Sequence, residues 1–102
     1  MADALPVVFQ RRAVQEIDAI DEWWRANRPL APALFAVELE RAVYALTLMP
    51  TLGARAHNER ARDVRRFLLR RTRYHVYYRV RRGALEVLAV WHAVRGTGPR
   101  LR

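Results

Sequence analysis

Six side chains in the second half of the sequence are of the types that RNA cleavage requires. His and Tyr move protons at a 2′-hydroxyl or a leaving oxygen. Arg stabilises charge that develops on a scissile phosphate, and Tyr stacks on an exposed base. The spacing predicts that all six share one face of a β-sheet. They are Arg66, Arg73, His75, Tyr77, Arg79 and His92.

These residues also have a second interpretation. Tyr is enriched in strands and Arg keeps a sheet surface in water, so a solvated sheet face would carry the same residue types. Residue type alone leaves both interpretations open. Arg79 and Glu86 are expected to form a cross-strand ion pair. His57 falls in an expected loop and is interpreted as incidental.

Positive charge is concentrated in one segment of the chain. Residues 60–82 contain ten Arg and one acid, Asp63, which together give +9. The other residues hold nine Arg and nine acids and sum to zero. Every basic residue is Arg, whose planar fork binds phosphate and carboxylate equally well. One basic patch of this kind predicts a polyanionic partner, either a nucleic acid or an acidic protein.

The composition excludes several kinds of site. The chain has no Cys, so it has no disulfide or thiolate chemistry. It has no glycine-rich phosphate loop, no Ser-His-Asp spacing and no metal-ligand spacing, so we expect neither a metal nor a cofactor. No apolar run approaches the roughly 20 residues of a membrane span, and the N-terminus lacks the order of a signal peptide. We therefore expect a soluble, cytoplasmic protein without a membrane partner.

The candidate residues depend on elements that the sequence pattern predicts. The length fits one domain over residues 1–102. A β-rich run at residues 5–10 predicts a short N-terminal strand, and residues 54–63 predict an irregular loop. Two apolar stripes with +4, +3, +4 spacing predict an antiparallel helical hairpin. The stripes are Ala13, Ile17, Ile20 and Trp24, then Phe35, Leu39, Ala42 and Leu46.

Three strands are expected after the hairpin, which makes the fold class α+β with an antiparallel sheet of three strands. A two-residue turn at Arg82-Gly83 fits the last connection, because Gly accepts positive φ. An odd-numbered loop would bury charge. The expected pairs that face the helices are Val80–Leu85, Tyr78–Val87, Val76–Ala89 and Tyr74–Trp91. The expected pairs on the opposite face are Arg79–Glu86, Tyr77–Leu88, His75–Val90 and Arg73–His92.

The end of the sequence carries a short pattern: Arg65, the run YHVYYRV at residues 74–80, the run LEVLAVWH at residues 85–92, and Arg95. With the order of elements, this pattern resembles the RelE/ParE superfamily of toxins from type II toxin–antitoxin systems over nearly the full chain. The resemblance implies a small basic toxin that inhibits growth, of a kind associated with plasmid stabilisation. It also implies an acidic antitoxin that neutralises the toxin in a hetero-oligomer.

The superfamily has two branches. RelE-like members are ribosome-dependent endoribonucleases that cut mRNA, whereas ParE-like members inhibit DNA gyrase and lack the nuclease residues. The cutting branch commonly has Arg where this chain has His75, and often Lys where Arg65 and Arg66 are the nearest candidates. Residues 90–95 look more like a ParE-type strand end, so the ParE-like branch is favoured and the RelE-like branch is the alternative.

The resemblance also implies roles for particular residues. In the ParE-like branch we expect no catalytic residue. In the nuclease alternative the catalytic candidates are His92, His75, Tyr77 and Arg66. The expected target-binding residues are Arg65, Arg66, Arg73, Arg79 and Arg95. Trp23 cannot share the helical stripe with Trp24, so we expect it to bind the antitoxin together with Arg70 and Arg71. The antitoxin segment is expected to be acidic and amphipathic.

Overall fold

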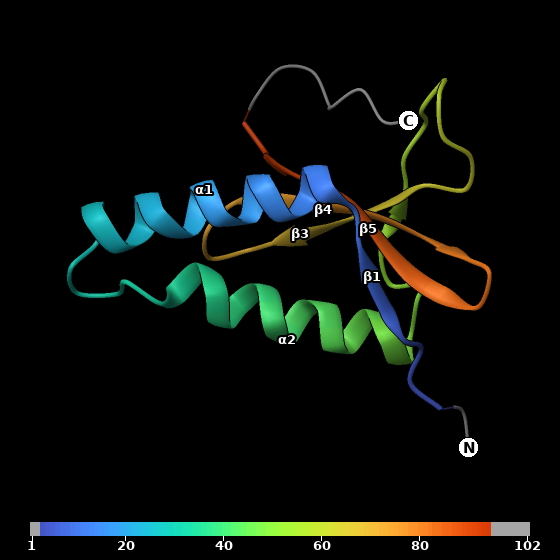
Figure 1. The fold of residues 1–102 in the computed structure, drawn as a ribbon, viewed down its shortest axis with the longest axis horizontal. Coiled ribbons are helices and arrows are strands. Elements are labelled where there is room, and N and C mark those ends of the chain that lie inside the picture. The colour runs from blue at the N-terminus through green and yellow to red at the C-terminus, as the bar shows by residue number, and fades with distance from the viewer. Residues whose placement is uncertain (1–2, 95–102) are drawn as a thin grey trace.

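The two apolar stripes lie on two helices that pack on the same face of a β-sheet (Figure 1). The computed structural model describes residues 3–94. Its elements are β1 (Val7–Phe9), α1 (Arg11–Asn27), α2 (Leu34–Leu48), β2 (Ala54–Arg55), β3 (Arg65–Leu69), β4 (Tyr74–Arg81) and β5 (Ala84–His92). The predicted α+β class and helical hairpin are confirmed. Within the described residues, no helix is both long and apolar enough to cross a membrane.

The sheet joins the three strands expected after the hairpin to the predicted N-terminal strand and to one strand, β2, that was not predicted. Its strand order is β1-β5-β4-β3-β2, so β3, β4 and β5 form the predicted antiparallel centre. The two-residue β2 comes from the segment predicted as a loop and pairs with β3. The N-terminal strand β1 joins the other edge and runs parallel to β5, with Val7 opposite Leu85. The sheet is therefore mixed rather than antiparallel throughout.

The core lies between the helices and the sheet. Ala13 of α1 and Phe35 and Leu46 of α2 are fully buried there, together with Val76 and Val87 of the sheet. Ile17, Ile20 and Trp24 of α1 pack against this cluster but stay partly exposed. Both predicted stripes are thus confirmed as the inner faces of their helices.

The last hairpin begins in the predicted register and then departs from it. Arg82 and Gly83 form the turn with φ of 54° and 75°, as a two-residue hairpin turn with positive φ at both positions requires. Three predicted pairs next to this turn are present, Val80–Leu85, Arg79–Glu86 and Tyr78–Val87. Tyr77 is then opposite Ala89 instead of Leu88, so Leu88 is the extra residue of a β-bulge.

The bulge reverses which residues of β5 face the helices. Val76 pairs with Val90, and Tyr74 pairs with His92. The predictions that Ala89 and Trp91 pack toward the helices, and that His92 faces away from them, were therefore wrong. One inserted residue moves every later side chain of the strand to the opposite face, because side chains alternate with a period of two.

The outer face of the sheet is only partly open to solvent. Tyr77, predicted to face solvent or a ligand, is 6% exposed. It lies in a second apolar cluster with Ala61 and Val64, which belong to the segment before β3, and with Leu88 and Ala89. The connection between β2 and β3 therefore covers part of the face on which the candidate site was expected.

The connection after α2 is fixed by one buried hydroxyl. The Tyr78 hydroxyl donates to the Pro50 carbonyl oxygen at 2.6 Å and accepts from the Gly53 amide at 2.8 Å. Burial raises the pKa of Tyr78 above its usual value, so the hydroxyl stays protonated and able to donate well above neutral pH. A Cβ at position 53 would lie 2.5 Å from this hydroxyl oxygen and 2.8 Å from the Arg66 carbonyl oxygen. The close approach of backbone to side chain therefore requires glycine.

A carboxylate of α2 fixes the loop between β3 and β4. Glu38 accepts hydrogen bonds from the Arg71 amide at 2.8 Å, from the Thr72 amide at 3.0 Å and from the Thr72 hydroxyl at 2.6 Å. Arg73 has a positive φ of 68° and precedes the first residue of β4. Glu38 thus supplies the acceptors for backbone groups that the tight loop leaves without strand partners.

Candidate functional site

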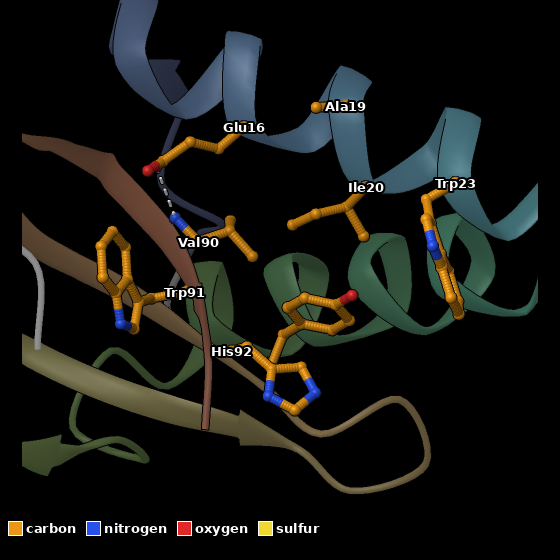
Figure 2. Close-up of a pocket in the computed structure, with 8 residues that line it drawn as sticks. Glu16, Ala19, Ile20, Trp23, Val90, Trp91 and His92 are labelled. Atoms are coloured by element: carbon orange, nitrogen blue, oxygen red, sulfur yellow. Dashed lines mark hydrogen bonds between the residues drawn. The ribbon is translucent and has the colours of Figure 1, made fainter. Parts of the chain in front are cut away.

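A groove of about 500 Å³ lies between α1 and the second half of β5 (Figure 2). It exists because β1 ends at Phe9, opposite Val87, and leaves the rest of the β5 edge without a neighbouring strand. Figure 2 shows Ile20 and Trp23 on α1 and His92 on β5 among the residues that line the groove. The lining residues are Glu16, Ala19, Ile20, Trp23, Tyr74, Val90, Trp91 and His92.

A side chain of α1 supplies a hydrogen-bond acceptor for the backbone at the edge of β5 in this groove. Glu16 accepts a hydrogen bond from the Val90 amide at 3.0 Å, which takes the place of the strand partner that β1 would have supplied. The other oxygen of Glu16 accepts from Arg12 Nε at 3.3 Å. The carboxylate therefore has a structural role and ties the first turns of α1 to the sheet.

Aromatic rings form the walls of the groove. Trp23 is 44% exposed, its ring centroid is 5.8 Å from that of Trp24, and the Arg28 guanidinium lies 4.8 Å above its ring. On the opposite wall, His92 meets Tyr74 edge to face at 5.0 Å between ring centroids. A large exposed aromatic beside an open strand edge is a surface suited to a protein segment rather than to a small polar substrate.

The predicted six-residue site is divided between the two faces of the sheet. His75 and Tyr77 lie on the outer face, with ring centroids 6.1 Å apart, whereas His92 lies on the helix side. Figure 2 shows Trp91 and His92 on opposite sides of the β5 ribbon. Trp91 takes the place opposite His75 that the prediction gave to Val90. The three proton-transfer candidates therefore do not form one cluster.

Electrostatics favour the neutral form of His75. Partial burial and the positive charges of Arg66 and Arg73 lower the pKa of its imidazole below the usual value of 6.5. Both Arg side chains belong to the predicted target-binding set, and the structure places them near His75 as expected. What they form is a cationic surface beside one neutral imidazole.

The lowered pKa of His75 makes the stability of the fold depend on pH. At acidic pH the unfolded chain binds more protons at this residue than the folded chain does, so the free energy of unfolding falls as pH drops below about 6.5. His75→Gln should flatten this dependence between about pH 7 and pH 5. Urea denaturation across that range checks the expectation, and a variant with the same slope as the unmodified protein would contradict it.

Two of the predicted target-binding Arg residues make hydrogen bonds or ion pairs with other residues of the protein. Arg65 donates to the Gly53 carbonyl oxygen at 2.7 Å. Arg79 pairs with Glu86 at 2.7 Å between Nε and Oε1, and both side chains are largely buried, so the expected cross-strand ion pair is confirmed. Arg66 and Arg73 are exposed. Arg95 lies outside the described residues.

The cationic residues of 60–82 do not gather at one point of the surface. The loop that precedes β4 carries Arg70, Arg71 and Arg73. The opposite end of β4 carries Arg81 and Arg82. The predicted partner-binding residues do belong to one end of the molecule. Trp23 lines the groove with Tyr74, which directly follows the loop that carries Arg70 and Arg71.

The comparisons with known proteins agree with this architecture. Residues 7–96 match the sequence profile of a family described as the ParE toxin of the type II toxin–antitoxin system parDE. The structure is similar to a chain of the chromosomal ParDE system of P. aeruginosa, with a TM-score of 0.69 and 23% identity over 87% of this chain and 96% of that one.

It is also similar to a chain of the toxin–antitoxin complex RelBE2 of Mycobacterium tuberculosis, with a TM-score of 0.61 and 22% identity. That similarity covers 88% of this chain and 99% of the other. No curated protein matches the chain. At these identities the two solved structures establish the fold alone.

Proposed function

Because the chain belongs to the ParE toxin family of type II toxin–antitoxin systems, we propose that it inhibits DNA gyrase and that an acidic antitoxin holds it inactive. The observation that supports the choice of target is the loss of the predicted cluster: His92 lies on the helix side of the sheet, and Tyr77, which shares the outer face with His75, is buried. A general acid–base mechanism requires both groups within reach of one substrate. A binding inhibitor has no such requirement.

The RelE-like alternative, a ribosome-dependent endoribonuclease, is favoured by one observation. His75 has a lowered pKa and lies near Arg66 and Arg73, so a neutral base lies next to cations that could hold a phosphate. The similarity to the RelBE2 chain extends to the fold only. The two functions differ in what the purified chain does to gyrase supercoiling and to translating ribosomes.

A triple variant separates the two functions. If the chain inhibits gyrase, His75→Gln, Tyr77→Phe and His92→Gln together should leave growth inhibition and gyrase inhibition largely intact, whereas Arg66→Gln should weaken both. If it is a nuclease, loss of one proton-transfer group should lower the cleavage rate by about 10²–10⁴. Circular dichroism of each variant controls for folding. A His92→Gln protein that binds ribosomes but no longer cuts mRNA would contradict the gyrase proposal.

The antitoxin is proposed to dock in the groove between α1 and β5. The groove offers an exposed aromatic, Trp23, beside the cationic loop that carries Arg70 and Arg71. An acidic, amphipathic segment that folds on binding would cover both features. The similar chain of P. aeruginosa belongs to a ParDE toxin–antitoxin system, which supports a partner of this class.

Loss of the exposed indole tests this docking surface. Trp23→Ala should weaken antitoxin binding by about 2 kcal/mol, roughly thirtyfold in Kd, because Trp anchors at the centre of an interface contribute at least that much. Val14→Ala is the control, since Val14 lies on the same helix, is 43% exposed and does not line the groove. Equal Kd values for the two variants, measured by calorimetry, would place the antitoxin elsewhere.

A further inference from the structure

Two arginines stand directly opposite each other on the short edge of the sheet. In the β2–β3 pair, Arg55 is the partner of Arg65, and residues directly opposite in an antiparallel pair hold their Cβ atoms about 5 Å apart on the same face. Like charges in this position destabilise a sheet. The repulsion disappears when an anion lies between the two guanidinium groups.

A cavity of about 440 Å³ lies at this position. It is lined by Arg55, Ala56, His57, Asp63, Val64 and Arg65. Arg65 donates only to neutral carbonyl oxygens, those of Gly53 at 2.7 Å and Thr51 at 3.4 Å. These bonds fix its position, and its guanidinium makes no ion pair among the described residues, although the Asp63 carboxylate lines the same cavity. Among the described residues the side chains of Arg55 and Asp63 make neither a hydrogen bond nor an ion pair.

The walls of the cavity are held in place by the surrounding chain. The Ala56 amide donates to the Val64 carbonyl oxygen at 2.9 Å, which continues the β2–β3 pairing beyond β2. Asn58 Oδ1 accepts from the Arg60 amide at 2.9 Å and from the Ala61 amide at 3.1 Å. Ala61 and Val64 are buried against the outer face of the sheet. Hydrogen bonds and apolar contacts therefore hold the segment that carries Arg55, His57 and Arg65.

We propose that this cavity binds a phosphate group of a nucleic-acid backbone, held by Arg55, Arg65 and His57. A phosphate offers enough oxygens for two planar guanidinium forks and an imidazole at once, whereas a single carboxylate has only two oxygens. The surrounding charge extends beyond one site, since residues 54–66 contain five Arg and two acids. A chain of phosphates contacts more of these positive charges than an isolated ion does, so it is expected to bind more tightly.

His57, which the sequence pattern left in a loop without a role, becomes a ligand donor through this arrangement. The site is distinct from the groove between α1 and β5 and from the outer face that carries His75. It does not depend on the gyrase proposal, because binding to a bare oligonucleotide involves neither gyrase nor an antitoxin.

The test compares two variants with the same change in charge. Arg55→Gln should weaken binding of a short fluorescent oligothymidine to the full chain about tenfold, measured by anisotropy. It should also reduce the slope of log K against log salt by about one. Arg81→Gln, which removes an exposed arginine at the far end of β4, should change the Kd far less. Equal losses would show unspecific attraction and would overturn the proposal.

Two further measurements separate phosphate from other anions. Without added anion, Arg55→Gln should raise Tm by a few degrees, about 1–4 °C, because it removes the repulsion. Pyrophosphate should raise the Tm of the unmodified chain more than that of the variant. Polyglutamate should compete poorly with the oligonucleotide, and equal competition would contradict the choice of phosphate. Saturation by pyrophosphate without measurable oligonucleotide binding would overturn the choice of nucleic acid.

Discussion

Val76→Asp is expected to unfold the protein. Val76 is fully buried in the core between the helices and the sheet, and no cation of the cluster around it could pair with a carboxylate. Burial of an unpaired charge costs several kcal/mol. That amount is a large share of the roughly 5–15 kcal/mol that stabilises a typical domain. Circular dichroism and urea denaturation of the purified variant check the expectation.

Val80→Asp is the matched control, because Val80 lies on the same strand and points to the same face but is 44% exposed. Its carboxylate stays in water, so the free energy of unfolding should change by less than about 0.5 kcal/mol. A Val76→Asp protein that still unfolds cooperatively near the midpoint of the unmodified chain would show that β4 turns its other face to the helices.

Gly53→Ala should destabilise the fold by about 2–4 kcal/mol. The new methyl group would meet the Tyr78 hydroxyl and the backbone oxygen of Arg66 at distances that no real Cβ tolerates. Relief of the clash requires movement of a backbone that Arg65 also holds. Overpacking of this kind costs about 1–3 kcal/mol, and loss of the hydrogen bonds of Tyr78 adds about 1 kcal/mol. Thermal denaturation measures the effect.

The double variant Gly53→Ala, Tyr78→Phe shows whether the hydroxyl causes the cost. Tyr78→Phe alone removes two hydrogen bonds, but it also removes the atom nearest to the new methyl group. The two losses should therefore be less than additive. Gly83→Ala provides the contrast, since a Cβ there meets nothing within 4 Å and only the positive φ opposes it. Strict additivity would mean that the cost comes from the contacts that the double variant keeps, with the ring at position 78 and with the Arg66 carbonyl oxygen.

The sequence patterns correctly predicted the two helices and the last hairpin turn, which depend on residues close together in the chain. The two stripes, from Ala13 to Trp24 and from Phe35 to Leu46, gave both helices and their inner faces, because helical spacing gathers apolar residues on one side. The turn at Arg82-Gly83 predicted the register of the adjacent pairs, because glycine readily adopts the positive φ that a two-residue turn requires. These features depend on neighbours within a few positions.

Features that depend on distant contacts were not predictable in this way. Nothing near Leu88 marks it as the extra residue of a bulge, yet this residue decides that His92 faces the helices and Trp91 does not. The burial of Tyr77 depends on Ala61 and Val64, whose segment was predicted only as a loop. The cavity at Arg55 arises because β2 pairs with β3, and two residues are too few to give a strand pattern.

The pairing of the first strand with the last determines when the chain can fold during its synthesis. The Leu85 amide donates to the Pro6 carbonyl oxygen at 2.8 Å, and the Gln10 amide donates to the Val87 carbonyl oxygen at 3.0 Å. Contacts between such distant segments give the fold a high contact order. β1 is synthesised before β5 and has no strand partner until β5 has left the ribosome. We expect a chain that ends before Ala84 not to form this sheet, so that loss of β5 abolishes the growth inhibition proposed above.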